Sequence, residues 1–125
     1  MKKHKKVVQA VNNYNYQNYE SQLKLASSYF TNSGWVGYKK ALDVSRNLDA
    51  MIKRQTTMSG KIVSPIQFSQ SKDTIIAIVP VDVTYKFPGG TKMPTSTLKV
   101  TLSMIHTPEG LKVTQYIAQM RLFLK

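Results

Sequence analysis

The chain has 125 residues, and its 18 Lys and Arg against six Asp and Glu give a formal net charge of +12. This length is sufficient for one domain whose hydrophobic core needs neither a disulfide nor a structural metal. The absence of cysteine excludes disulfide frameworks, thiolate metal sites and cysteine nucleophiles. The longest apolar run, Ile75 to Val79, is far shorter than the roughly 20 residues that a membrane-spanning helix needs.

The positive charge is compatible with three kinds of partner: nucleic acid, an anionic membrane surface or an acidic protein. The lysines are scattered along the chain, only three arginines occur, and no aromatic residue stands in an RNA-binding signature. A solvated basic surface is the simplest interpretation, and a nucleic-acid-binding module is the alternative. Residues 1–6, MKKHKK, are expected to form a basic tail, which is a juxtamembrane segment, a remnant of cloning or a phosphate-binding arm.

The first half of the chain, residues 7–55, has helical periodicity. Apolar and aromatic residues recur three or four positions apart from Val7 to Phe30, and Asn12–Asn13 predict a break because asparagine is a poor helix former. Thr31 is predicted to cap a second helix whose apolar face carries Trp35, Tyr38 and Leu42.

A third, short helix is expected to begin at Ser45 or Asn47, either of which can cap it, and to end near Gln55. Beyond this point, residues 56–125 are strand-like. The first run, residues 56–63, is rich in β-branched residues but contains Gly60, which predicts a bulge or an edge strand.

The clearest strand runs from Asp73 to Phe87, where apolar residues occupy the odd positions. Pro80 predicts an edge or a bulge in its middle, because proline cannot donate a ladder hydrogen bond. Two further alternating runs follow, Thr97 to His106 and Leu111 to Leu124, and the second changes face at Thr114–Gln115, which predicts a bulge. Helices followed by four antiparallel strands predict an α+β fold.

Acid–base chemistry would draw on the two histidines and six carboxylates, of which His4, His106 and Asp82 stand out. Structural roles are the simpler explanation for His4 in the basic tail and for His106 at a strand end. Asp82 either lines a cavity of the sheet or pairs on the solvent face with Lys86 or Lys99. No nucleophile elbow, phosphate loop or metal-ligand spacing occurs, so we expect neither an enzyme nor a cofactor or metal site.

A family resemblance is carried by the segment YNYQNYESQLKLASSYFTNSGW at residues 14–35, followed by YKKAL at 38–42 and SRNLDAMIKRQ at 45–55. It resembles the periplasmic domain of the DotI, IcmL and TraM proteins of type IVB secretion and conjugation systems. The resemblance runs from about Val7 to Gln119. Its most specific pieces are Asn18-Tyr19, Tyr29-Phe30-Thr31, Gly34-Trp35 and Asn47-Leu48, whereas PVDVTY at 80–85 matches in pattern.

The resemblance implies one periplasmic α+β domain over residues 7–125, with helices packed on a strongly curved antiparallel sheet. This is the cystatin-like cone of the eighth VirB component. It also implies a non-catalytic scaffold of the secretion or conjugal transfer apparatus, which contacts other subunits and copies of itself. Members of the family are bacterial inner-membrane proteins, so the parent protein is expected to carry a membrane anchor upstream of this domain.

Three residues are the candidates for partner contact or groove lining: Tyr16, Asn18 and Trp35. Tyrosine is favoured at interfaces, and Tyr16 departs from the helical stripe, but helical core packing is the other interpretation of this aromatic segment. Two docking sites are expected. One is a sheet edge near Ile62 to Phe68, blunted by Pro65, and the other is the groove between sheet and helices.

Overall fold

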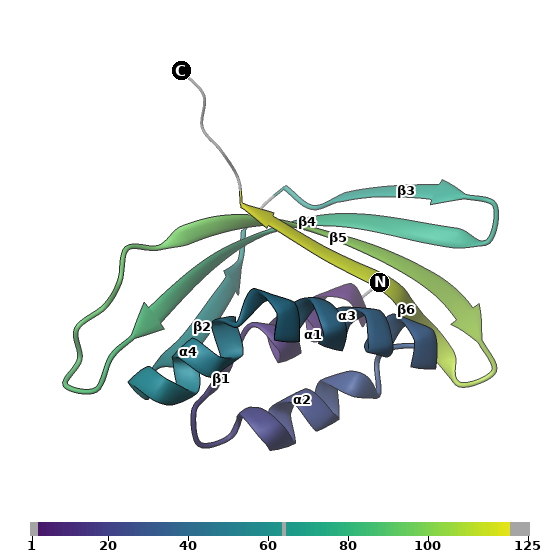
Figure 1. Ribbon diagram of the computed structural model, residues 1–125. Coiled ribbons are helices and arrows are strands. Elements are labelled where there is room, and N and C mark those ends of the chain that lie inside the picture. The colour runs from purple at the N-terminus through teal and green to yellow at the C-terminus, as the bar shows by residue number, and fades with distance from the viewer. Residues whose placement is uncertain (1–2, 64, 121–125) are drawn as a thin grey trace.

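The computed structural model describes residues 3–63 and 65–120, in which four helices lie beneath a curved antiparallel sheet (Figure 1). The helices are α1 (Lys3–Val11), α2 (Tyr19–Ser27), α3 (Asn32–Ser45) and α4 (Asn47–Arg54). The strands are β1 (Tyr14–Asn15), β2 (Thr57–Ile62), β3 (Gln67–Ser71), β4 (Thr74–Lys86), β5 (Ser96–Thr107) and β6 (Gly110–Met120). The predicted α+β class is confirmed. In this part of the chain, no helix has both the length and the apolar character to cross a membrane.

The described sheet has six strands rather than the four expected. Its order is β1-β2-β4-β5-β6, with β3 also paired to β4, and every pairing is antiparallel. The sequence pattern misses β1 because it has two residues, and β3 because QFSQS is exposed at all five positions and has no apolar alternation. The predicted end of the last strand at Leu124 lies outside the described residues.

Pro80 lies in the middle of β4 without a bulge, but one side of the strand has no paired residue at this position, which confirms the predicted edge at mid-strand. On one side of β4, β3 pairs as far as Ile78 and β2 takes over from Val81. The Pro80 carbonyl accepts a hydrogen bond from the Val63 amide at 3.0 Å, so this side of the residue faces the gap between the two strands. The N–H that Pro80 lacks would therefore point to the place where pairing with β3 ends and pairing with β2 begins.

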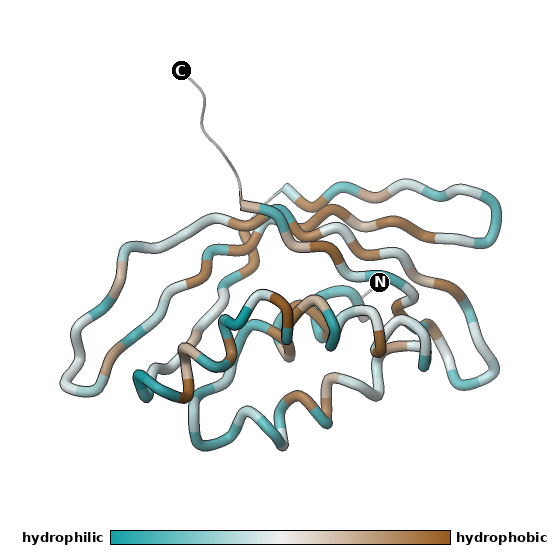
Figure 2. Tube along the Cα trace, viewed as in Figure 1, coloured by the Kyte–Doolittle hydropathy of each residue, from teal (hydrophilic) through white to brown (hydrophobic). Residues whose placement is uncertain are grey.

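The core lies between the concave face of the sheet and the helices. The odd positions of β4 point into it as predicted, and the buried ones are Ala77, Val79, Val81 and Val83. From the helical side, α1 contributes Val7, Val8 and Val11, each at most 2 % exposed. In Figure 2 the apolar residues gather where strands pass over helices, and the turns at either end of the sheet are mostly polar.

Backbone pairing attaches the start of α3 to β6. The Val113 amide donates to the Tyr29 carbonyl at 2.8 Å, and the Thr31 amide donates to the Val113 carbonyl at 2.9 Å. The Gly34 amide donates to the Thr31 hydroxyl at 3.0 Å, which confirms Thr31 as the cap of α3. The bulge predicted in the last strand is also confirmed, because Thr114 is skipped in the pairing of β5 with β6.

β2 pairs continuously with β4 through Gly60, so the predicted bulge is absent. On the other side β1 pairs only with Thr57 and Met58, so within the described residues this side of β2 is an edge at Gly60, as predicted. A Cβ at Gly60 would lie 2.7 Å from the Asn12 Cβ. Asn12 is buried, and its side-chain amide donates to the Val8 carbonyl and the Tyr116 hydroxyl, both at 2.9 Å. Gly60 therefore provides room for the polar residue that ends α1.

Residues 3–6, expected in the basic tail, form the first turn of α1, and His4 is 2 % exposed. The His4 ring meets Phe68 of β3 edge to face, with centroids 4.9 Å apart. Among the described residues, neither ring nitrogen of His4 has a hydrogen-bond partner. Burial lowers the pKa of His4, and the charge of Lys5 adds to this effect.

Alanine substitution of the two glycines of α3 is expected to change the free energy of unfolding in opposite directions. A Cβ at Gly34 would lie 2.4 Å from the Val113 carbonyl oxygen, whereas a Cβ at Gly37 meets open space. We expect Gly37→Ala to raise the free energy of unfolding by up to about 1 kcal/mol through helix propensity. Gly34→Ala should lower it by about 2 kcal/mol, because backbone atoms cannot move aside. Urea denaturation measures both, and similar effects at the two positions would contradict the close packing of α3 on β6.

The buried imidazole predicts an acid-dependent loss of stability. Because the folded state lowers the pKa of His4, the unfolded chain binds the proton first as pH falls below about 6.5. The free energy of unfolding should therefore decrease between about pH 7.5 and about pH 5.5, above the range where most carboxylates titrate. A His4→Leu variant should show a shallower decrease in parallel urea titrations. Parallel curves for the two proteins would contradict the buried, neutral state of His4.

Candidate functional site

Trp35 belongs to an aromatic cluster that joins α3 to β6, together with Phe30, Tyr38 and Tyr116. Ring centroids are 5.2 Å apart for Phe30 and Trp35, 5.5 Å for Trp35 and Tyr38, and 5.1 Å for Tyr38 and Tyr116. Phe30 is buried, and Trp35 is partly buried against the core. Trp35 therefore has a packing role of its own, and its contact with a partner stays a prediction.

Tyr16 and Asn18 lie in the turn between β1 and α2. The side-chain oxygen of Asn15 accepts a hydrogen bond from the Asn18 amide at 2.9 Å, and that of Asn18 accepts one from the Asn15 amide at 2.7 Å. The Tyr16 amide donates to the Thr56 carbonyl at 3.3 Å, and its side chain is half-buried. Asn18 thus builds the turn, whereas nothing in these contacts uses the Tyr16 hydroxyl.

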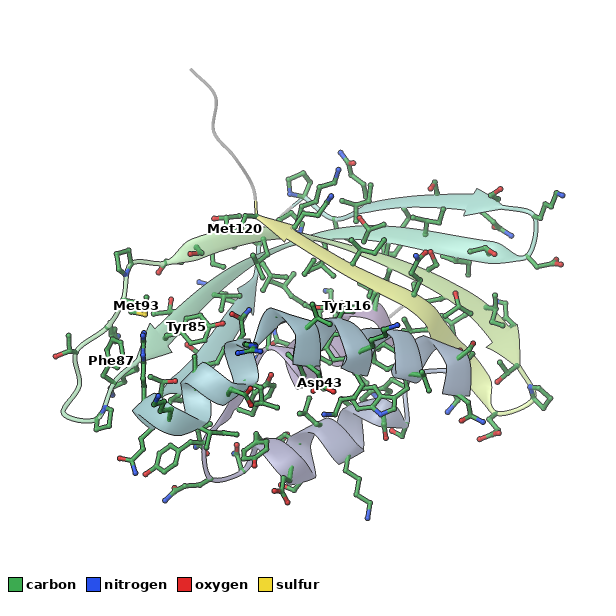
Figure 3. All side chains as sticks on the ribbon, viewed as in Figure 1. Asp43, Tyr85, Phe87, Met93, Tyr116 and Met120 are labelled. Carbon is green, nitrogen blue, oxygen red and sulfur yellow. The ribbon has the colours of Figure 1, made fainter. Side chains whose placement is uncertain are left out.

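A groove of about 220 Å³ lies between α3, α4 and the sheet. None of the described residues that line it is charged. Four tyrosines line it, each from a different element: Tyr14 of β1, Tyr38 of α3, Tyr85 of β4 and Tyr116 of β6. Figure 3 shows Tyr116 between α3 and the sheet and Tyr85 nearer the α4 end. The expected groove between sheet and helices is therefore lined by phenols from across the chain.

The tyrosine hydroxyls of the groove differ in their partners. Tyr116 accepts from Asn12, whereas the hydroxyls of Tyr14, Tyr38 and Tyr85 have no hydrogen-bond partner within the described residues. None of these three oxygen atoms is sealed from solvent. Burial raises the pKa of Tyr14 to about 12 and also raises the pKa values of Tyr38, Tyr85 and Tyr116. All four phenols are neutral hydrogen-bond donors at physiological pH.

A second pocket of about 160 Å³ adjoins the groove and lies between α4 and the loop that joins β4 to β5. Its apolar lining includes Met51, Phe87 and Met93, and Arg54 is the one charged residue among the described residues that line it. The loop is held in place because the Met93 amide donates to the Tyr85 carbonyl at 2.9 Å. Sequence reasoning named none of these residues as a site. The inward odd position of Tyr85 on β4 was the available signal.

The candidates for acid–base chemistry lie apart from this groove. Asp82 is on the opposite face of β4 from the buried valines and accepts a hydrogen bond from the Thr97 hydroxyl at 2.8 Å. The predicted ion pair with Lys86 or Lys99 is wrong, because the neighbour directly opposite Asp82 on β5 is Thr97. His106 is exposed near the end of β5.

The expected docking edge near residues 62–68 corresponds to the end of β2 and the start of β3. Residue 64 is outside the described residues. β3 pairs with β4 along one side only, and Phe68 on it is 51 % exposed. This edge stays a second candidate for docking, because all five residues of β3 are exposed and, within the described residues, β3 pairs only with β4.

The fold is that of the periplasmic domains of VirB8-type proteins. The chain is similar to the VirB8 protein of Agrobacterium tumefaciens, with 12% identity and a TM-score of 0.74 over 98% of this chain and 91% of that one. It is also similar to the periplasmic domain of DotI, with 23% identity and a TM-score of 0.75 over 95% of this chain and 91% of that one. The predicted curved-sheet architecture is confirmed.

An IcmL-like type IV secretion system protein of Legionella pneumophila subsp. pneumophila strain Philadelphia 1 is similar at 25% identity. Its TM-score is 0.86 over 96% of this chain and 89% of that one. A family model described as type-IV b secretion system, inner-membrane complex component, matches residues 3–120. The chain therefore belongs to the DotI/IcmL family of type IVB secretion system components. No curated protein sequence matches it.

The raised phenol pKa values predict a loss of stability in alkali. Above about pH 10 the unfolded chain ionises its tyrosines, whereas Tyr14 and Tyr116 keep their protons in the fold. The free energy of unfolding should therefore fall as pH rises from about 10 towards 12. Tyr14→Phe should make this fall shallower, as measured by urea denaturation alongside phenolate absorbance. An unchanged slope in the variant would contradict the burial of Tyr14 in the groove wall.

Proposed function

We propose that this chain is a non-catalytic assembly component of a type IVB secretion or conjugal transfer apparatus, working in the periplasm at the inner membrane. It acts by protein–protein contacts with other subunits and with copies of itself, and Tyr16, Asn18 and Trp35 contribute to those contacts. The family match over residues 3–120 supports the class of machine. The groove of unpartnered tyrosine hydroxyls is the observation that favours a binding role.

Several properties of the groove are typical of an interface. Tyrosine offers a large apolar surface with one hydroxyl and is enriched where proteins meet. Three hydroxyl groups in the groove lack partners within the described residues, so a bound chain gains hydrogen bonds that the domain itself does not use. Weak contacts of this kind become strong when many copies are held in one membrane, because effective concentration rises.

A nucleic-acid-binding module is the second candidate, and the net charge of +12 favours it. The exposed cations are spread over the surface rather than collected in one stripe: Lys24 is on α2, Lys40 on α3, Lys61 on β2 and Lys99 on β5. This spread favours a solvated basic surface. Affinity for duplex DNA that falls steeply with salt and persists at physiological salt would support the second candidate.

The assembly role predicts contacts that can be trapped in bacteria. A photoreactive benzoylphenylalanine in place of Tyr16, in the full-length parent protein, should form adducts with other subunits of the apparatus when illuminated. The same group in place of Lys99, which is exposed on the sheet face opposite the core, is the control and should form fewer. Mass spectrometry identifies the adducts. Absence of apparatus subunits from the adducts at position 16 would contradict the proposed contact.

Measuring substrate transport in the same strain distinguishes a scaffold role of this chain from a catalytic one. Asp82→Asn keeps a side-chain oxygen as acceptor for Thr97 but removes the charge that acid–base chemistry would need. We expect this variant to sustain substrate transport at the wild-type rate. A loss of transport with normal protein abundance would favour a catalytic role for Asp82.

A further inference from the structure

The groove and the second pocket adjoin each other, because Asn47, Met51 and Tyr85 line both, and together we call them the channel. In Figure 3, Tyr85, Phe87 and Met93 gather beside α4, and Tyr116 lies deeper, between α3 and the sheet. The channel therefore runs from an interior lined by tyrosines to a mouth with apolar walls. With volumes of about 220 and 160 Å³, its two parts accept individual side chains of a ligand rather than a whole helix.

Within the part of the chain that the structure describes, Arg54 at the mouth is the one charged residue that lines the channel, and no carboxylate lines either part. The two ion pairs within the described residues, Lys39–Asp43 and Lys112–Glu109, do not involve Arg54. A guanidinium beside Met51, Phe87 and Met93 is a ready partner for a carboxylate, which it can bind through two parallel hydrogen bonds.

The unpartnered hydroxyls narrow the class of ligand further. Tyr14, Tyr38 and Tyr85 come from different elements but converge on the groove, where each lies close enough to another to affect a phenol pKa. A ligand that satisfies their hydroxyls needs several acceptors. An extended peptide offers a carbonyl at every residue, whereas a lipid acyl chain has none. A peptide is therefore the better match to an apolar channel with several donors.

We propose that this channel binds a short extended segment of another protein, which places a large apolar side chain between Met51, Phe87 and Met93 and a nearby carboxylate on Arg54. The inference rests on the proposed assembly function and names the chemistry of the partner. The segment lies along the tyrosines with its main-chain carbonyls accepting from their hydroxyls. The partner is acidic in this segment, as the charge at the mouth requires.

A second copy of this chain is a poor occupant. The chain has six acidic residues against eighteen basic ones, and two of the carboxylates are already paired with lysines. Asp82, a third, accepts a hydrogen bond on the far side of the sheet. A second copy therefore has few carboxylates to offer Arg54, whereas an acidic segment of a different subunit supplies one.

The test uses a phage-displayed library of random peptides selected on the purified chain. We expect the enriched peptides to share a large apolar residue within two positions of Asp or Glu. Selection on Arg54→Gln should lose the acidic residue from the consensus. Enrichment without a carboxylate, or no enrichment at all, would overturn the proposal.

The best synthetic peptide is then titrated against four variants by isothermal calorimetry. Arg54→Gln should weaken binding by about tenfold or more, as expected for loss of a charge-assisted hydrogen bond. Tyr85→Phe should weaken it by about fivefold, through loss of one hydroxyl donor. Met93→Glu, at a residue that is 42 % exposed and so tolerant of change, should weaken it by about tenfold or more, because it places a competing carboxylate in the mouth.

Lys53→Gln is the matched control, because it removes the same charge from the same turn of α4 without touching the channel. Equal losses of peptide affinity for Lys53→Gln and Arg54→Gln would show that only the net charge matters, and would overturn the proposed site. Sedimentation of the free chain that shows dimers weakened by Arg54→Gln would assign the channel to a second copy. Anionic vesicles of phosphatidylglycerol that bind through Arg54 more strongly than through Lys53 would assign it to a lipid.

The peptide-binding proposal and the proposed assembly function can fail independently of each other. If adducts at position 16 contain apparatus subunits but no peptide binds, the channel inference fails and the assembly role stands. If peptides bind as expected but no adduct contains an apparatus subunit, the assembly role fails and the channel is a peptide site of another system.

Discussion

The backbone pairing of Val113 with Tyr29 and Thr31 determines where the helices sit on the sheet. It joins the connection before α3 to β6 by two main-chain hydrogen bonds, of 2.8 and 2.9 Å. Gly34 then packs directly on the Val113 carbonyl, which a side chain would prevent. Because the first turn of α3 is attached to β6, the rings of Trp35 and Tyr38 contact that of Phe30. These contacts set the direction of the helix axis.

The remainder of the groove follows from this attachment. At the other end of α3, Arg46 has a left-handed backbone with a φ of 58°, which a non-glycine residue adopts at some cost, and it turns the chain into α4. Leu48 and Met51 of α4 are buried against the sheet, and this fixes one wall of the channel. The opposite wall is the curved sheet itself, against which the valines of α1 pack in the core.

The sequence predicted those features that have a local cause. The break at Asn12–Asn13, the cap at Thr31, the inward face of β4 and the bulge at Thr114 each depend on neighbouring residues alone. At Pro80 and Gly60 the sequence could not choose between an edge and a bulge, because the surroundings of each residue come from distant partners: the gap between β3 and β2, and the side chain of Asn12.

The candidate site was only partly predictable from the sequence, for the same reason. Asn18 and Trp35 stand in recognisable motifs, yet the structure gives each a local structural role, in a turn and in an aromatic cluster. The channel residues Tyr85 and Arg54 are 31 positions apart and meet only through the fold. The buried state of His4 was missed because a run of lysines conceals the apolar face of α1.

The hydroxyls of Tyr14, Tyr38 and Tyr85 make no hydrogen bond within the described residues and stay open to solvent, so the fold does not use them. Phenylalanine would supply the same apolar ring at each position, so packing alone does not account for the three hydroxyls. Polar groups that a fold does not use cluster at functional sites, because stability alone gives no reason to retain them. Arg54 stands in the last turn of α4, where the helix dipole favours a cation, and its exposed guanidinium remains available to an acidic group at the mouth. The unused hydroxyls and this guanidinium line one channel, and the proposed peptide site depends on their combination.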